Sequence, residues 1–266
     1  ILLSIVIDYN SLTNDQIHGD HMMRVREEGV KNFYTYYQLL YENLVETDSS
    51  LIRMGPRGDG GYLTPMIASE CVGCFSPGVS LLGNGEPKAG FDLDVAEKFG
   101  IPVYTIDPKK IIITNTYQNI FFQQGKISYD ISSQKEDSSK NESKVKTLTL
   151  SEWVNGYISD EKSDLLLQMD IEGYEWDVFR HEDAEFLSRF KVMIVEWHNL
   201  GCLSYERTFA NMMIINNKIL NDFAIVHIHP NNHTLIFGDG KNLFTDCIEV
   251  TYINKSKVLH RKSNSW

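Results

Sequence analysis

The stretch Leu165-Leu166-Leu167-Gln168-Met169-Asp170-Ile171-Glu172-Gly173-Tyr174-Glu175-Trp176 (LLLQMDIEGYEW) joins an apolar run to an acid, a glycine and a further acidic segment. The apolar run is too short for a buried helix and favours a fully buried parallel strand that ends at Asp170. The acidic residues around Gly173 suit the first turn of a following helix. In open α/β sheets, ligands bind beyond the carboxyl ends of the strands, so Asp170 is predicted to lie at a ligand site.

The composition argues against several classes of partner. The 266 residues include 25 Lys and Arg against 36 Asp and Glu, a formal net charge of −11. This charge argues against nucleic-acid or anionic-membrane binding and favours a small-molecule or neutral polar substrate. No apolar run is long enough for a membrane-spanning helix, and four cysteines in a chain of this length do not make a disulfide framework. These features predict a reducing, cytoplasmic location and indicate nothing about the oligomeric state.

Two segments stand apart from the main pattern. Apolar residues between His21 and Glu46 have helical spacing, so residues 1–50 are predicted to form a helical leader to a domain over residues 51–266. Residues 132–146 (SSQKEDSSKNESKVK) are polar and of low complexity. Since such a segment cannot bury apolar area, it is predicted to be a mobile surface insertion within that domain.

Residues 72–107 have the pattern of a nucleotide-binding βαβ unit. A buried strand leads into a loop that contains Gly78, a helix over residues 91–99 ends before Gly100, and a second strand ends at Asp107. An acid at the end of that strand can accept hydrogen bonds from a ribose diol. The loop has one glycine in its turn, which is weaker than the full glycine fingerprint of nicotinamide-binding proteins.

Strands and helices alternate through the rest of the chain. Further strands are predicted at 121–127, 165–170, 192–198, 223–229 and 248–253, and helices at 147–157, 176–190 and 205–220. The alternation predicts an α/β fold in which helices cover both faces of a mostly parallel sheet. Because parallel strands end at one edge, the polar residues at the strand ends are predicted to line one crevice. These residues are Asp107, Asp170, Glu196, His198, His229, Asn231 and Asn232.

The sequence resembles the FkbM-type methyltransferases, which use S-adenosylmethionine. The resembling segments, in the family's order, are Asp59-Gly60-Gly61-Tyr62, Phe75-Ser76-Pro77-Gly78-Val79, Tyr104-Thr105-Ile106-Asp107-Pro108, Met169-Asp170-Ile171-Glu172-Gly173-Tyr174-Glu175, Val195-Glu196-Trp197-His198 and His229-Pro230-Asn231-Asn232. The resemblance implies a Rossmann-like methyltransferase fold with a seven-stranded sheet whose last strand is antiparallel.

The resemblance also implies a set of cofactor-binding residues. Pro77, Gly78 and Val79 would approach the amino-acid part of the cofactor, and Asp107, followed by Pro108, would bind the ribose hydroxyls. The adenine would lie near Gln124, and Asp170 is a further candidate contact. The turn made of Asp59, Gly60, Gly61 and Tyr62 would close over the methionine end.

Methyl transfer to a hydroxyl needs alignment of the two reactants and either a general base or a divalent cation. Asp170, Glu196 and His198 are the candidate catalytic residues. One hypothesis is that Asp170, His198 and His229 hold Mn, Fe, Zn or Mg, with Glu196 as a fourth ligand or a partner of the ligands. The alternative is a metal-free site in which His198 or His229 acts as the base and Asp170 contacts the cofactor.

The leading functional hypothesis is an O-methyltransferase that acts on a hydroxyl of a sugar or glycan. A methyltransferase acting on a lipid or secondary metabolite is the second reading. A nicotinamide-dependent oxidoreductase on the same type of sheet and a non-catalytic binding module are the alternatives from other classes.

Overall fold

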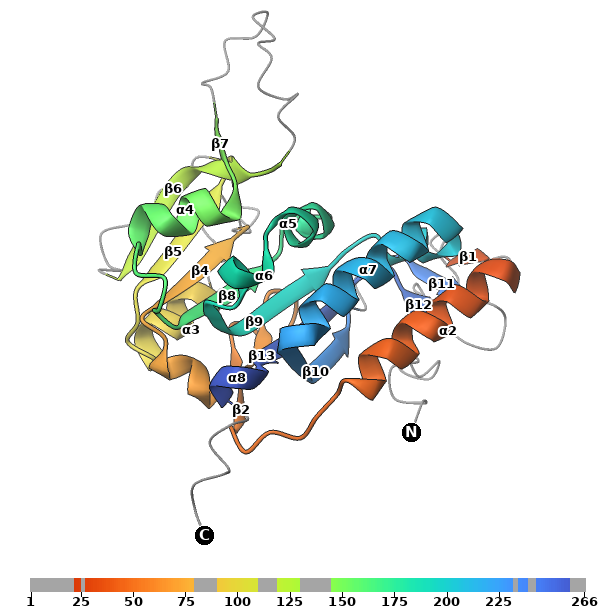
Figure 1. Ribbon diagram of the computed structural model, residues 1–266, viewed down its shortest axis with the longest axis horizontal. Helices are drawn as coiled ribbons and strands as arrows, with labels where there is room; N and C mark the ends of the chain where they lie inside the picture. Colours follow the sequence, from red (N-terminus) through yellow and green to blue (C-terminus); the bar gives the residue numbers. More distant parts are fainter. Residues whose placement is uncertain are drawn as a thin grey trace, which may run out of the picture. The chain divides into compact units, whose positions relative to one another are not determined.

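The computed structural model describes residues 22–24, 27–78, 90–109, 119–129, 145–231, 234–238 and 243–258 (Figure 1). Two units are distinguished, one formed by Ser49–Val195 and the other by Ile1–Asp48 together with Glu196–Trp266. Val79 and residues 132–144 of the predicted insertion lie outside the described residues. Within the described ranges, no helix has both the length and the apolar character that crossing a bilayer requires.

The unit Ser49–Val195 is built on parallel strands. Paired residues such as Pro77 with Ile106, and Asp107 with Gln124, show that the carboxyl ends of neighbouring strands lie along one edge. The last two residues of the final strand, Glu196 and Trp197, belong to the other unit. The strands are β4 (Gly73–Pro77), β5 (Val103–Asp107), β6 (Ile120–Ile127), β7 (Lys146–Leu148), β8 (Leu165–Met169) and β9 (Phe190–Trp197).

The strand order of the main sheet is β10-β13-β9-β8-β4-β5-β6-β7, in which β10 (Phe223–Pro230) and β13 (Ile248–Asn254) are antiparallel. The predicted mostly parallel α/β sheet with an antiparallel last strand is confirmed, but the predicted number of seven strands is wrong because the described residues form a sheet of eight. The additional strand is β7, which pairs in parallel with β6 through Gly125 and Lys146. A three-residue edge strand has too little apolar alternation to be recognised from sequence.

Helices cover both faces of the sheet in the unit Ser49–Val195. Phe75 of β4 contacts Trp153 of α4 with 5.2 Å between ring centroids. Ser76 points to the opposite face, where it lowers the pKa of Asp92 of α3 and its Oγ donates to Gln168 Oε1 at 2.6 Å. The predicted helix 176–190 is interrupted because Asp183 caps a second short helix by accepting a hydrogen bond from Phe186 N at 2.7 Å. The other elements are the hairpin β2 (Leu51–Met54) and β3 (Tyr62–Pro65), the 3₁₀ helix η3 (Met66–Glu70), α3 (Gly90–Lys98), α4 (Leu150–Tyr157), α5 (Glu175–His181) and α6 (Ala184–Leu187).

The other unit joins the N-terminal helix to the C-terminal part of the chain. Helices α2 (Glu27–Glu42) and α7 (Glu206–Asp222) lie side by side (Figure 1), and Asn216 Nδ2 donates to Tyr36 OH at 3.5 Å. The end of β9 is fixed by Trp197 Nε1, which donates to Tyr252 OH of β13 at 3.0 Å. The remaining elements are η5 (Leu200–Ser204), α8 (Lys255–Val258) and a small sheet of β1 (Met22–Arg24), β11 (Ile236–Gly238) and β12 (Leu243–Thr245).

Candidate functional site

A pocket of about 590 Å³ lies at the carboxyl ends of β4, β5, β6 and β8 in the unit Ser49–Val195. This is the edge where open α/β sheets bind ligands, and the volume falls within the range of about 300–1,000 Å³ that is typical of small-molecule sites. The lining residues are Pro77, Gly78, Ile106, Asp107, Pro108, Lys109, Lys126, Ile127, Ser128, Asp170, Ile171, Glu172 and Tyr174.

The backbone at Gly78 shapes the floor of this pocket. Its φ is +92°, and a β-carbon at position 78 would overlap the carbonyl oxygen of Asp170. Gly78 N donates to Ile106 O at 3.1 Å, and Asp170 N donates to Pro77 O at 3.3 Å. The ends of three strands therefore approach each other so closely that only glycine fits at this position.

Asp107 stands half-buried at the end of β5. Its Oδ1 accepts a hydrogen bond from Lys109 N at 2.7 Å, which fixes the turn after the strand. Gln124 lies opposite Asp107 in the register of β5 and β6, and its Nε2 donates to Pro108 O at 3.1 Å. The predicted ribose and adenine contacts thus occupy neighbouring strands, although the pocket lining among the described residues does not include Gln124.

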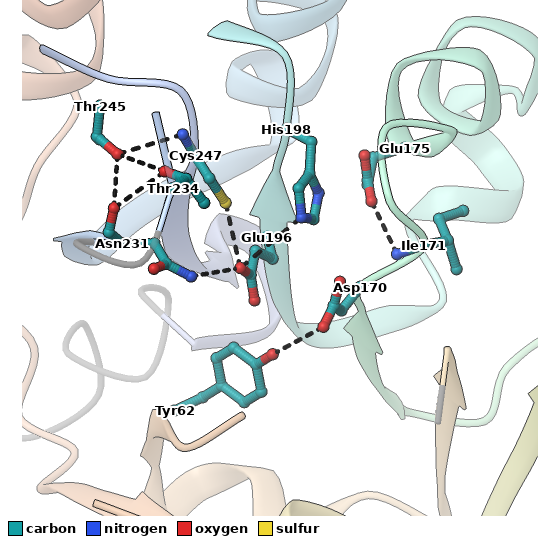
Figure 2. A network of polar contacts seen from close by, with 10 residues as sticks. All are labelled: Tyr62, Asp170, Ile171, Glu175, Glu196, His198, Asn231, Thr234, Thr245 and Cys247. Atoms are coloured by element: carbon teal, nitrogen blue, oxygen red, sulfur yellow. Dashed lines mark hydrogen bonds and ion pairs between the residues drawn. The ribbon is translucent and has the colours of Figure 1, made fainter. Parts of the chain in front are cut away.

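The turn after β8 presents Asp170 at the pocket. Glu172 and Gly173 have φ values of 57° and 101°, so the chain reverses tightly after the strand. Ile171 N donates to Glu175 Oε1 at 2.8 Å, which ties this turn to the first turn of α5 (Figure 2). Tyr62 OH donates to Asp170 Oδ2 at 3.5 Å. The LLLQMDIEGYEW stretch therefore acts as one structural piece that holds Asp170 at the pocket.

The segment that leads into the predicted turn Asp59-Gly60-Gly61-Tyr62 is held by the side chain of Arg53. Arg53 Nε donates to Pro56 O at 2.7 Å and Arg53 Nη2 donates to Gly58 O at 2.9 Å. Of the predicted residues in this turn, Tyr62 contacts Asp170, while Asp59 is exposed. The described pocket lining includes none of Asp59, Gly60, Gly61 and Tyr62, so their contact with the cofactor stays a prediction.

A second polar cluster lies within the other unit, at the ends of β9 and β10 and before β13. Three groups converge on Glu196 Oε1: Asn231 Nδ2 donates to it at 2.8 Å, Cys247 Sγ donates at 3.2 Å, and His198 Nε2 lies 3.8 Å away (Figure 2). Glu196 is 3 % exposed and Cys247 is fully buried. We call this set of four residues the Glu196 cluster.

Hydrogen bonds to the main chain hold the Glu196 cluster in place. Asn231 N donates to Cys247 O at 3.0 Å, and Asn231 O accepts from the hydroxyls of Thr245 at 2.6 Å and Thr234 at 3.1 Å. Burial raises the pKa of Asp246, and a hydrogen bond from Gly201 N and the nearby His198 offset part of this rise. Hydrogen bonds therefore link Glu196, Asn231 and Cys247 into one buried network.

The predicted metal ligands are distributed over both units. Asp170 belongs to Ser49–Val195, while His198 and His229 belong to the unit with the chain ends. His229 is exposed on β10, and its ring lies nearly parallel to that of His227 with 6.3 Å between centroids. The set of Asp170, His198 and His229 therefore stays a prediction.

Sequence reasoning missed several residues of both sites. Cys247 was counted only as one of four cysteines, and nothing in its surroundings within the sequence indicates that it meets Glu196. Lys109, Lys126 and Tyr174 also line the pocket. They lie after β5, near the end of β6 and after β8, and this position near a strand end was the only feature of the sequence that could have identified them.

Several solved structures are similar to the chain at low identity. A fibrillarin/Nop5p complex has 13 % identity and a TM-score of 0.38, over 70 % of this chain and 73 % of that chain. Methanococcus jannaschii fibrillarin pre-rRNA processing protein has 12 % identity and a TM-score of 0.38, over 78 % and 83 %. A putative riboflavin biosynthesis protein from Shewanella sp. PV-4 has 9 % identity and a TM-score of 0.25, over 80 % and 96 %. Similarities this weak support no statement about function.

The family comparison bears on the chain directly. No curated protein matches the chain at a significant level. Residues 101–214, which include Asp107, Asp170, Glu196 and His198, match the family model of the methyltransferase FkbM domain. This match confirms the resemblance found in the sequence. Residues 101–214 of the chain therefore match a methyltransferase FkbM domain, and the activity that this match supports is that of a methyltransferase.

Proposed function

We propose that the protein methylates a hydroxyl of a sugar or glycan and binds S-adenosylmethionine in the pocket at the ends of β4, β5 and β8. The observation that carries the cofactor assignment is the joint lining of this pocket by Gly78, Asp107 and Asp170. The sugar or glycan as acceptor rests on the family resemblance and on the net charge of −11, which argues against polyanionic substrates.

The residues present fit this cofactor. Gly78 lines the pocket without a side chain, so the main chain there can approach a ligand closely. The half-buried Asp107 carboxylate suits a pair of ribose hydroxyls, and Pro77 and Pro108 provide apolar surface beside it. When bound, S-adenosylmethionine supplies an electrophilic methyl group on a sulfonium.

The task of the protein is to align the acceptor oxygen and to receive its proton. A base among its residues would receive the proton of the acceptor hydroxyl, and the pocket walls would hold that oxygen in line with the methyl group. Asp170, Glu196 and His198 are the proposed catalytic residues, of which Asp170 lines the pocket itself. A divalent cation at Asp170, His198 and His229 is the alternative means of acidifying the hydroxyl.

Calorimetric titration with S-adenosylmethionine, S-adenosylhomocysteine and NAD tests the cofactor assignment. The first two are expected to bind and NAD is not. In Asp107→Ala, affinity for S-adenosylhomocysteine should fall by about 10–100-fold, because two hydrogen bonds to a charged group are lost. Glu97→Ala, which removes an exposed acid from α3, should bind as the wild type does. Unchanged affinity in Asp107→Ala contradicts the ribose assignment, and preferential binding of NAD contradicts the proposed function.

The acceptor is identified by transfer of a labelled methyl group to panels of free sugars, glycans, lipids and secondary metabolites. Label in the glycan fraction supports the proposal, and label confined to lipids or secondary metabolites contradicts it. Repeating the assay with EDTA and then with Mn, Fe, Zn or Mg separates a metal-assisted reaction from one that uses a side-chain base alone.

A further inference from the structure

The Glu196 cluster contains three different kinds of metal-ligating atom in one place. A carboxylate oxygen of Glu196, an imidazole nitrogen of His198 and the sulfur of Cys247 all lie within 4.8 Å of one another. Glu196 and His198 are two residues apart at the end of β9 and therefore project to the same side, while Cys247 precedes β13. All three belong to one unit, so their arrangement is set within that unit.

The spacing of these atoms suits a tetrahedral metal ion. Glu196 Oε1 lies 3.2 Å from Cys247 Sγ and 3.8 Å from His198 Nε2. A zinc ion with bonds of about 2.3 Å to sulfur and about 2.0–2.1 Å to nitrogen and oxygen places its ligand atoms about 3.3–3.6 Å apart. The two distances to Glu196 Oε1 therefore need adjustments of only a few tenths of an ångström, and the distance between the His198 and Cys247 ligand atoms is at most 4.8 Å.

We propose that Glu196, His198 and Cys247 form a zinc-binding site with three protein ligands. A thiolate together with an imidazole favours zinc over magnesium and calcium, which prefer oxygen ligands alone. Binding releases the thiol proton of Cys247, and the metal takes the place of the hydrogen bond from Sγ to Glu196 Oε1. This set shares His198 with the three ligands predicted from sequence, and Glu196 with the fourth position considered there, whereas Cys247 is new and Asp170 and His229 are absent from it.

The surroundings orient the three ligands before any metal arrives. Asn231 Nδ2 donates to Glu196 Oε1 at 2.8 Å, and Asn231 N donates to the carbonyl of Cys247 at 3.0 Å. Asp246 lies close enough to His198 for the two to interact electrostatically. Carboxylates and amides that support metal ligands in this way fix the ligand positions and raise metal affinity.

Three protein ligands leave the fourth tetrahedral position for an oxygen ligand. The His198 side chain is 15 % exposed while that of Glu196 is 4 % exposed, so His198 is the ligand nearest to solvent. A water molecule or a hydroxyl of a bound molecule completes the tetrahedron there, as in zinc sites that keep one exchangeable position. The inference requires neither S-adenosylmethionine nor an acceptor, so it stands or falls separately from the proposed function.

Metal analysis of the full chain, purified without chelators and dialysed against metal-free buffer, tests the site. The wild type should retain close to one zinc ion per chain by plasma mass spectrometry. In Cys247→Ser and His198→Gln, zinc affinity should fall at least about 100-fold, and in Asn231→Ala it should fall by about 10–100-fold. Cys202→Ser and His227→Gln change the same residue types in the same unit and should keep the wild-type zinc content.

Cobalt replacement gives a readout that a purely structural role of Cys247 would not produce. Cobalt-loaded wild type and Cys202→Ser should show a thiolate-to-cobalt charge-transfer band, and Cys247→Ser should lack it. Circular dichroism identifies variants that fail to fold. If Cys247→Ser fails to fold, His198→Gln replaces it as the ligand variant, because the His198 side chain is partly exposed and its loss should disturb the fold less. A wild type that retains no zinc, or a folded ligand variant that retains it fully, overturns the proposal.

Discussion

In the pocket at the ends of β4, β5 and β8, main-chain groups set most of the geometry, whereas in the Glu196 cluster side chains set it. The pocket depends on the φ of +92° at Gly78 and on hydrogen bonds between main-chain groups of neighbouring strands. The cluster depends on Glu196 receiving hydrogen bonds from Asn231 and Cys247 of two other segments. A substitution should therefore act through backbone strain in the first region and through lost side-chain partners in the second.

Asp170→Asn should give the largest change in activity. Asp170 is the acid that the β8 turn presents at the pocket, and the amide keeps its size but removes its charge. Turnover should fall by about 100-fold or more while the melting temperature stays close to that of the wild type. Asp177→Asn, at an exposed position of α5, is the control. Wild-type turnover in Asp170→Asn would remove this residue from the mechanism.

Gly78→Ala tests the backbone side of the comparison. The added β-carbon would overlap Asp170 O in a left-handed conformation, so the free energy of unfolding should fall by about 2–4 kcal/mol and cofactor binding should weaken. Gly156→Ala in α4 meets no atom within 4 Å and should stabilise the protein by up to about 1 kcal/mol. Urea unfolding measures the difference in stability between the two variants. Equal midpoints would show that the main chain at the ends of β4 and β8 can shift to accept a side chain at position 78.

Asp92→Asn tests whether a buried carboxyl group near strand β4 makes the free energy of unfolding depend on pH. Burial raises the pKa of Asp92 from 3.8 to about 7, and a hydrogen bond with Ser76 offsets only part of the rise. The folded state therefore keeps a proton that the unfolded state releases, so this group loses its stabilising contribution as the pH rises from about 4 to about 7. Unfolding at pH 5 and pH 8 should show a decline of roughly 2–4 kcal/mol in the wild type that is absent in the variant. An identical decline in both proteins would assign it to other groups.

Thr245→Val tests the side-chain cluster and should have the smallest effect. The Thr245 hydroxyl donates to Asn231 O at 2.6 Å and contacts Thr234 Oγ1 at 2.9 Å, so its loss leaves a buried carbonyl with one donor fewer. The free energy of unfolding should fall by about 1–2 kcal/mol. Ser69→Ala removes an exposed hydroxyl that bonds Met66 O and should change it by less than about 0.5 kcal/mol. A Thr245→Val variant as stable as Ser69→Ala would show that Asn231 keeps its place without this network.

Much of the pocket was predictable because its determinants are consecutive in the sequence. The LLLQMDIEGYEW stretch contains the strand, the acid and the tight turn in order, and Gly78 and Asp107 follow their own strands in the same way. The extra strand β7 was not predictable, since three edge residues become a strand only by pairing with β6. The break between α5 and α6 was missed because Asp183 competes locally as a cap within an otherwise helical pattern.

The sequence by itself determined the alternation of strands and helices, the family and the residues that end the parallel strands, because each of these is written in neighbouring residues. Only the tertiary structure decided that Cys247 and Asn231 meet at Glu196 Oε1, and that the carbonyl of Asp170 excludes a side chain at position 78. Such contacts join residues far apart in the chain. Their distances depend on how the strands pack, which no local pattern of residue types specifies.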